Sequence, residues 1–93
     1  MRQFKSLFGP IVLSNERLRH ILRFHPDVRG SLRHFTSTLE APDETLRSAH
    51  DPQVVMCYRY LPSRKRHLAI VVHVQKRFIV TAYLARKRKR DTL

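Results

Sequence analysis

Acidic residues are scarce in this sequence of 93 residues. Seven Asp and Glu stand against 19 Lys and Arg, which gives a net charge of +12 with neutral histidines. An excess of this size favours a polyanionic partner, which is RNA, DNA or an acidic protein. A solubilising surface or a basic tail is the alternative explanation. Most acidic side chains precede Pro52 and the basic clusters follow it, so the positive charge gathers in the second half of the chain.

Cysteine and long apolar runs are also lacking. Cys57 is the single cysteine, which excludes an intrachain disulfide and a cysteine-rich metal site and predicts a small buried residue. No apolar run approaches the length of a membrane span. The apolar core of a signal peptide is missing, because Gly9-Pro10 and Asn15-Glu16 interrupt the N-terminal segment. We therefore expect one cytoplasmic domain over residues 1–93 with no membrane contact.

No metal-binding motif accompanies the six histidines. None of them matches HExxH or a Cys/His finger, and few carboxylates lie near them in the sequence. We expect neither a metal nor another cofactor. Histidine can still act as a general acid or base without a metal, since an unperturbed imidazole has a pKa of about 6.5.

The strongest pattern in the chain is a pair of alternating runs within residues 66–86. Alternation over this length, rich in β-branched residues, predicts a β-hairpin. A three-residue turn, Gln75-Lys76-Arg77, would put the apolar residues on one face. That face would hold Leu68, Ile70, Val72, Val74, Phe78, Val80, Ala82 and Leu84. The other face would carry His67, His73, Thr81 and Tyr83 among small apolar residues, and it is where we look for chemistry.

Helical patterns occupy the first half of the chain. Ser14 or Asn15 can cap a first helix, which ends near Phe24 because Pro26 follows. Pro26 suits the first turn of a second helix. Its apolar face is Val28, Leu32, Phe35 and Leu39, and residues 42–49 can add one or two turns. Residues 53–61 alternate as a further strand. The order predicts an α+β fold, with two or three helices on one face of a three- to four-stranded antiparallel sheet and a basic tail over residues 86–93.

These residue types suit RNA cleavage. RNA carries its own nucleophile, the 2′-hydroxyl, and cleavage needs a base, cations around the phosphate, and an acid for the departing 5′ oxygen. His, Arg, Lys, Thr and Tyr on one sheet face can supply that set. The same groups also describe a surface that binds RNA or DNA and cuts nothing. A protein-interaction module that meets an acidic partner is a third alternative.

Three ordered motifs resemble a known family. They are HILRFHPD at residues 20–27, TLEAPD at residues 38–43 followed by Arg47-Ser48, and FIVTAY at residues 78–83. Together they resemble the phage-type branch of the barnase–EndoU–colicin–RelE ribonuclease superfamily, over roughly Ile11 to Lys87. The resemblance implies a helical pair on a four-stranded antiparallel sheet and metal-independent cleavage of RNA. It also implies a toxin-like protein, with an acidic antitoxin or immunity protein as a further partner.

The resemblance also indicates site residues. It points to His20 and His25 as acid or base, to Thr81 and Tyr83 as positioning hydroxyls, and to Arg59 as the cation on the phosphate. Further contacts to nucleic acid are expected from His73, Lys76, Arg77, Arg64, Lys65, Arg86, Lys87 and Arg88. The turn at Gln75-Lys76-Arg77 departs from expectation, because it has no glycine or asparagine.

Overall fold

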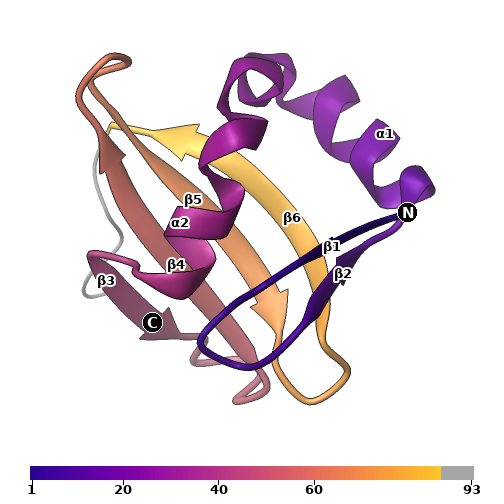
Figure 1. Cartoon of the computed structure of the whole chain (residues 1–93). Coiled ribbons are helices and arrows are strands. Elements are labelled where there is room, and N and C mark those ends of the chain that lie inside the picture. Colours follow the sequence, from indigo (N-terminus) through magenta and orange to yellow (C-terminus); the bar gives the residue numbers. More distant parts are fainter. Residues whose placement is uncertain (87–93) are drawn as a thin grey trace.

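A computed structural model describes residues 1–86 of the protein. They form an α+β domain in which the helices lie on one face of a six-stranded sheet (Figure 1). The elements in chain order are β1 Arg2–Phe4, β2 Ile11–Leu13, α1 Asn15–Phe24, the 3₁₀ helix η1 Pro26–His34, α2 Phe35–Glu40, β3 Glu44–Arg47, β4 Val54–Leu61, β5 Arg66–His73 and β6 Phe78–Ala85. No helix within residues 1–86 is long and apolar enough to cross a membrane.

The sheet is larger than predicted and it is mixed. Its strand order is β1-β2-β6-β5-β4-β3, and all neighbours are antiparallel except β2 and β6. The prediction of three to four antiparallel strands was therefore wrong. The added strands are three or four residues long, too short to show a clear alternation. Residues 44–47, expected to be helical, instead pair with β4 as β3.

The first helix begins and ends where the sequence predicted. The Ser14 hydroxyl caps α1 by accepting the backbone N–H of Arg17 at 3.1 Å. Ile21 is the fully buried residue of this helix. The following segment was expected to be one α-helix, but it is a 3₁₀ helix that continues into the short α2. Its predicted apolar face nevertheless points to the core, because Val28, Phe35 and Leu39 are fully buried.

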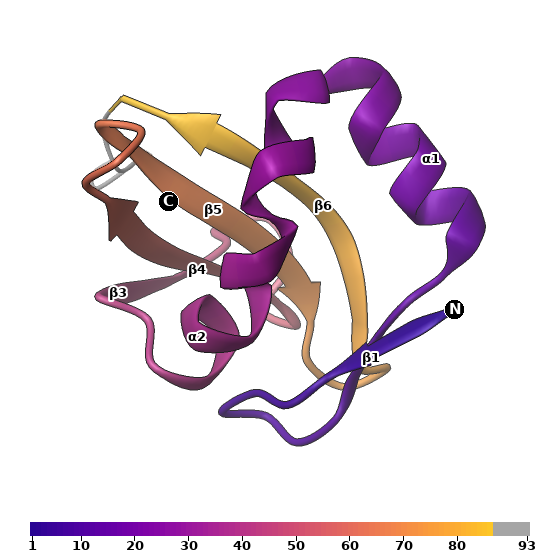
Figure 2. The ribbon, with the colours of Figure 1, turned by 45° about the horizontal axis from the view of Figure 1, so that its top comes forward.

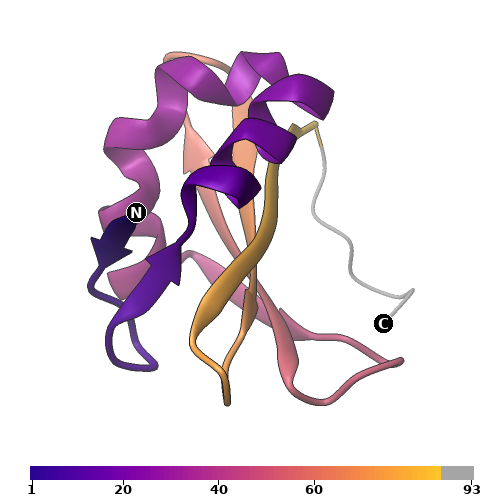
Figure 3. The ribbon, with the colours of Figure 1, turned by 90° about the vertical axis from the view of Figure 1, so that its right-hand side faces the viewer.

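The core lies between the helices and one face of the sheet (Figure 2). We call this the covered face. The sheet contributes alternate residues of the three long strands and both ends of β2. They are Ile11, Leu13, Val55, Cys57, Leu61, Leu68, Ile70, Val72, Ile79 and Ala82. An edge-on view shows the helices on this side of the sheet alone (Figure 3).

The predicted β5–β6 hairpin is confirmed, but its turn has four residues. Val74 to Arg77 form the turn, and the N–H of Arg77 donates to the carbonyl of His73 at 2.8 Å. With a turn of four residues and a regular ladder, the apolar residues of β5 and β6 would face opposite sides of the sheet. A bulge at Val80 corrects this, because Val71 pairs with Thr81 and Val72 with Ile79. Ile79 therefore enters the core in place of its two neighbours on the strand.

The opposite side of the sheet, which we call the helix-free face, has a smaller apolar cluster. Met56, Tyr58 and Ala69 are buried there, and Leu46, Val71 and Tyr83 pack against them. Alternation also places Tyr60, His67, His73 and Thr81 on this face. The helix-free face therefore carries the mixed set of side chains that the sequence predicted for it.

Candidate active site

One edge of β6 is open to the helices. Among the described residues, β2 pairs with β6 only at Val12 and Phe78, so residues 79–85 have no strand on that side. The first helix and η1 pack beside this stretch (Figure 2). A residue at the turn between those two helices can therefore reach the end of β6.

His25 occupies that turn because of the proline after it. A residue before proline is disfavoured in the α region, and His25 leaves the helix at φ −135° and ψ 67°. Its backbone N–H still donates to the Ile21 carbonyl at 2.7 Å, which holds the turn against α1. Its imidazole then lies 5.8 Å from the ring of Tyr83, measured between centroids. The structure thus brings together two predicted site residues that lie 58 positions apart in the sequence.

Tyr83 and Thr81 share the helix-free face. Tyr83 pairs with Ala69 and Thr81 with Val71, and both side chains are half-buried. Their α-carbons are about 7 Å apart along the strand. The two hydroxyls that the family resemblance singled out therefore belong to one surface, and His25 reaches the Tyr83 end of it.

His67 is a neighbour of Tyr83 that was absent from the predicted site. It pairs with Ala85 on the helix-free face, which makes it the diagonal neighbour of Tyr83 at roughly 7–8 Å. Its ring stands 5.1 Å from that of Tyr60. The alternation of residues 66–86 already placed His67 on the same face as Tyr83, so the signal was present in the sequence.

His20 lies elsewhere. It is exposed on α1, where its ring packs 4.8 Å from the ring of Phe24, itself 60% exposed. The guanidinium of Arg23 stands 5.7 Å from the same Phe24 ring. The structure brings His25, and not His20, to the strand hydroxyls.

Arg59 also lies away from Tyr83. It alternates with Cys57 and Leu61 on the covered face, so the sheet separates it from the tyrosine. Its Nη1 donates to the Ala41 carbonyl at 2.7 Å. The adjacent backbone N–H of Tyr60 donates to the Asp43 carboxylate at 2.7 Å. Arg59 therefore ties the segment between α2 and β3 to β4.

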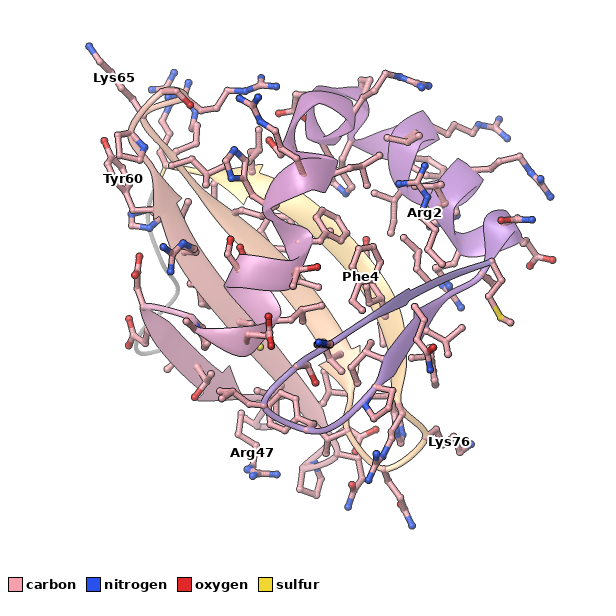
Figure 4. All side chains as sticks on the ribbon, in the orientation of Figure 1. Arg2, Phe4, Arg47, Tyr60, Lys65 and Lys76 are labelled. Atoms are coloured by element: carbon pink, nitrogen blue, oxygen red, sulfur yellow. The ribbon has the colours of Figure 1, made fainter. Side chains whose placement is uncertain are left out.

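The predicted nucleic-acid contacts separate into two groups at opposite ends of the sheet. Figure 4 shows Lys65 at one end and Lys76 at the other. Arg64 and Lys65 lie in the β4–β5 turn, and Arg86 follows β6 at the same end as Tyr83. The second group is His73, Lys76 and Arg77, at the β5–β6 turn. Lys87 and Arg88, with the rest of the predicted tail from residue 87, lie outside the described residues.

Both basic turns hold a residue in the left-handed region. Lys65 has a φ of 53° and Arg77 a φ of 59°, and they are the non-glycine residues with positive φ among the described residues. Such a conformation costs about 1–2 kcal/mol for a residue with a β-carbon. Glycine would remove this cost, so each turn has a basic side chain at a position where glycine would fit the backbone better.

His73 makes different contacts from His67. Its ring stacks on Phe78 at 5.4 Å with an angle of 11° between the planes. Its Nδ1 accepts the backbone N–H of Lys76 at 3.2 Å, which fixes the imidazole against the turn. This histidine therefore has a structural partner for its ring and for one ring nitrogen.

A surface pocket lies away from these residues. A hollow of about 310 Å³ is lined by Gln3, Phe4, Lys5 and Pro10 on the β1–β2 side. An extended polyanion binds along a charged surface rather than inside a closed cavity. The candidate site is accordingly defined by side-chain chemistry and not by concavity.

Cys57 is fully buried, and burial raises the pKa of its thiol to about 11. The thiol is therefore protonated at neutral pH, which fits the packing role that the sequence predicted. Within residues 1–86 no three His, Cys, Asp or Glu side chains gather as a set of metal ligands.

Comparison with known proteins gives no relative. No protein-family model matches the chain, and neither a curated protein nor a solved structure matches it. The family resemblance therefore rests on the three motifs in the sequence.

Proposed function

We propose that this chain is a small, basic, cytoplasmic endoribonuclease of toxin type that cleaves RNA without a metal ion. The observation that carries the proposal is the meeting of His25 and Tyr83, with their rings 5.8 Å apart at the edge of β6. An imidazole and a phenol in contact are a proton-transfer group and a hydrogen-bond donor, which phosphodiester cleavage needs.

The reaction uses the nucleophile of the substrate. The 2′ oxygen of the RNA attacks the adjacent phosphorus while the bond from phosphorus to the 5′ oxygen breaks. His25 carries one of the two proton transfers that accompany this exchange. The Tyr83 hydroxyl donates a hydrogen bond to the phosphate, and Thr81, on the same face, positions the neighbouring nucleotide. The products are a 2′,3′-cyclic phosphate and a 5′-hydroxyl.

Positive charge near the site supports an RNA substrate. Arg64 and Lys65 in the β4–β5 turn and Arg86 after β6 lie at the end of the sheet that holds Tyr83, and the chain carries a net charge of +12. The Arg64 guanidinium packs against Gly30 of η1, where a β-carbon would collide with it. This contact holds one cation of the turn beside the 3₁₀ helix that follows His25. An acidic antitoxin or immunity protein would cover the same surface.

The test is cleavage of a labelled oligoribonucleotide by purified protein in excess EDTA. We expect cleavage by the wild type, products that end in 2′,3′-cyclic phosphate, and no cleavage of the matching DNA. His25→Ala should lower the rate by about 10²–10⁴-fold, the usual contribution of general acid–base catalysis.

His20→Ala is the matched control. It removes an exposed histidine of α1, the helix that ends just before His25, and should leave the rate within about twofold, since surface substitutions rarely matter. Cleavage that requires an added divalent ion would contradict the proposal. Tight, salt-dependent RNA binding with no turnover would instead favour a non-catalytic binding module.

A further inference from the structure

His67 has an unexplained buried nitrogen. Its Nδ1 is buried and has no hydrogen-bond partner among the described residues. Buried polar atoms are normally paired, and an unpaired one in a native protein calls for an explanation such as a catalytic or ligand-binding role. His73, six positions along the same strand face, has its Nδ1 paired with the Lys76 N–H. The two histidines of β5 therefore differ in the feature that matters for proton transfer.

A row of rings crosses the helix-free face at one end of the sheet. His25 contacts Tyr83 from beyond the edge of β6, at 5.8 Å. His67 is the diagonal neighbour of Tyr83 on the other side, and Tyr60 of β4 holds its ring at 5.1 Å. Tyr83 thus stands between two imidazoles, one from the turn that follows α1 and one from β5.

The reaction proposed above needs such an arrangement. In phosphoryl transfer the attacking and leaving oxygens stand roughly in line, on opposite sides of the phosphorus. The group that takes the 2′ proton and the group that protonates the 5′ oxygen must therefore also lie on opposite sides. A phosphate bound at the Tyr83 hydroxyl would have one imidazole on each side.

We propose that His67 is the second proton-transfer residue of the ribonuclease, paired with His25 across Tyr83. This inference rests on the proposed function and adds its missing partner. Tyr60 is a positioning residue, since it holds the His67 ring and need not touch the substrate. No group within residues 1–86 bonds Nδ1, so no hydrogen bond from that part of the chain fixes which ring nitrogen of His67 carries the proton.

The step balances in protons and bonds. One neutral imidazole accepts the 2′-hydroxyl proton as the bond from the 2′ oxygen to phosphorus forms. The other, protonated, gives its proton to the 5′ oxygen as that oxygen leaves. The two imidazoles have then exchanged protonation states, and proton exchange with water restores them.

The experiment compares two RNA substrates. One has an ordinary phosphodiester at the cleaved position, and the other has sulfur in place of the bridging 5′ oxygen. A thiolate leaves without a proton, because a thiol has a pKa of about 8.5. The sulfur substrate therefore bypasses the general acid and still requires the base.

We expect His67→Ala to cleave the ordinary substrate at least about 10²-fold more slowly than the wild type. His50→Ala, the control at an exposed histidine between β3 and β4, should stay within about threefold, since surface substitutions rarely matter. The sulfur substrate should return one of His25→Ala and His67→Ala to near the wild-type rate, and not the other. A merely structural role for His67 would not produce this split.

Folding and binding are checked in parallel. His67→Gln keeps a polar side chain of similar size and should lose as much activity as His67→Ala, with its melting temperature near that of the wild type. Both variants should bind a 2′-O-methyl oligonucleotide, which cannot react, within about tenfold of the wild type.

The outcomes separate the two proposals. A fully active His67→Ala beside an inactive His25→Ala would overturn the role of His67 and leave the proposed function standing. Rescue of both alanine variants by the sulfur substrate, or of neither, would also overturn the pairing. A wild type that cleaves neither substrate would remove the proposed function and this inference together.

Discussion

The two faces of the central sheet are built from the same three long strands and differ in the side chains that they carry. The covered face is apolar throughout its centre, and it is closed by Ile21, Val28, Phe35 and Leu39 from the helices. The helix-free face holds a cluster of three buried residues, and tyrosines, histidines and a threonine lie around it. Strand alternation thus puts stability on one side and candidate chemistry on the other. Substitutions on the two faces should therefore affect different measurements.

The largest expected effect is on the stability of the covered face. Phe35 is fully buried, and its ring stands 5.5 Å from that of Phe4. Phe35→Ala should lower the free energy of unfolding by about 3–5 kcal/mol. Tyr60→Ala on the helix-free face, where Tyr60 is 43% exposed, should cost less than about 1 kcal/mol. Urea unfolding of both variants measures the difference, and equal losses would contradict the division between the faces.

The covered face was also the more predictable of the two. Alternation of the strands and helical spacing in the first half identified most of its residues, because burial of apolar surface follows period 2 and period 3.6 directly. The sequence did not predict that Ile79 faces the core. A four-residue turn and a bulge at Val80 together place Ile79 on the covered face, where a regular hairpin with a three-residue turn would place Phe78 and Val80. No local pattern marks a bulge of this kind.

The candidate site residues of the helix-free face could not all be chosen from the sequence, because the choice depends on tertiary contacts. Alternation placed Thr81, Tyr83 and His67 on it, but choosing among the histidines required knowing which helix turn reaches the edge of β6. His20 and His25 are equivalent by motif, and the backbone at Pro26 decides between them. Arg59 was a plausible cation by type, but the alternation of β4 turns it to the covered face, where it bonds Ala41.

A second prediction compares one variant that should lose activity alone with another that should lose stability alone. Tyr83→Phe keeps the ring that packs against Met56, Tyr58 and Ala69 and removes the hydroxyl. We expect the cleavage rate to fall by about 10²-fold, which is typical when a hydrogen-bond donor to the reacting group is lost, and the free energy of unfolding to change little. Ile70→Val on the covered face should do the reverse, at a cost of about 0.5–1.5 kcal/mol and with the rate unchanged. If Tyr83→Phe retains the wild-type rate, the hydroxyl has no part in the reaction.

A third prediction concerns alkaline pH and the covered face alone. The raised pKa of Cys57, from 9.0 to about 11, means that the unfolded chain loses its thiol proton first as pH increases. The folded state then binds more protons than the unfolded state between those values, so stability should fall as pH rises through this window. The full effect is about 2–3 kcal/mol. Cys57→Ala lacks this titration, so its stability should approach that of the wild type between pH 8 and pH 10.5, as followed by urea unfolding.

The smallest effect concerns the basic turns at the ends of the helix-free face. Lys65 has a positive φ that glycine would adopt without strain. Lys65→Gly should therefore raise the free energy of unfolding. The net gain is up to about 1 kcal/mol, because the greater flexibility of glycine in the unfolded chain offsets part of the relieved strain. The same variant should weaken RNA binding and lower the slope of log K against log salt by about 1, the expected change when one phosphate contact is lost.

Arg59→Ala is the control for this last substitution. The Arg59 guanidinium donates to the Ala41 carbonyl on the covered face. The variant should therefore lower the free energy of unfolding and leave the slope of log K against log salt unchanged. If Lys65→Gly raises the free energy of unfolding and weakens RNA binding, the strained conformation of this turn is kept because the Lys65 side chain contacts the RNA. If Lys65→Gly is more stable and binds RNA with the wild-type salt slope, the phosphate contacts come from other cations of the chain, and the turn beside His67 lies outside the RNA path.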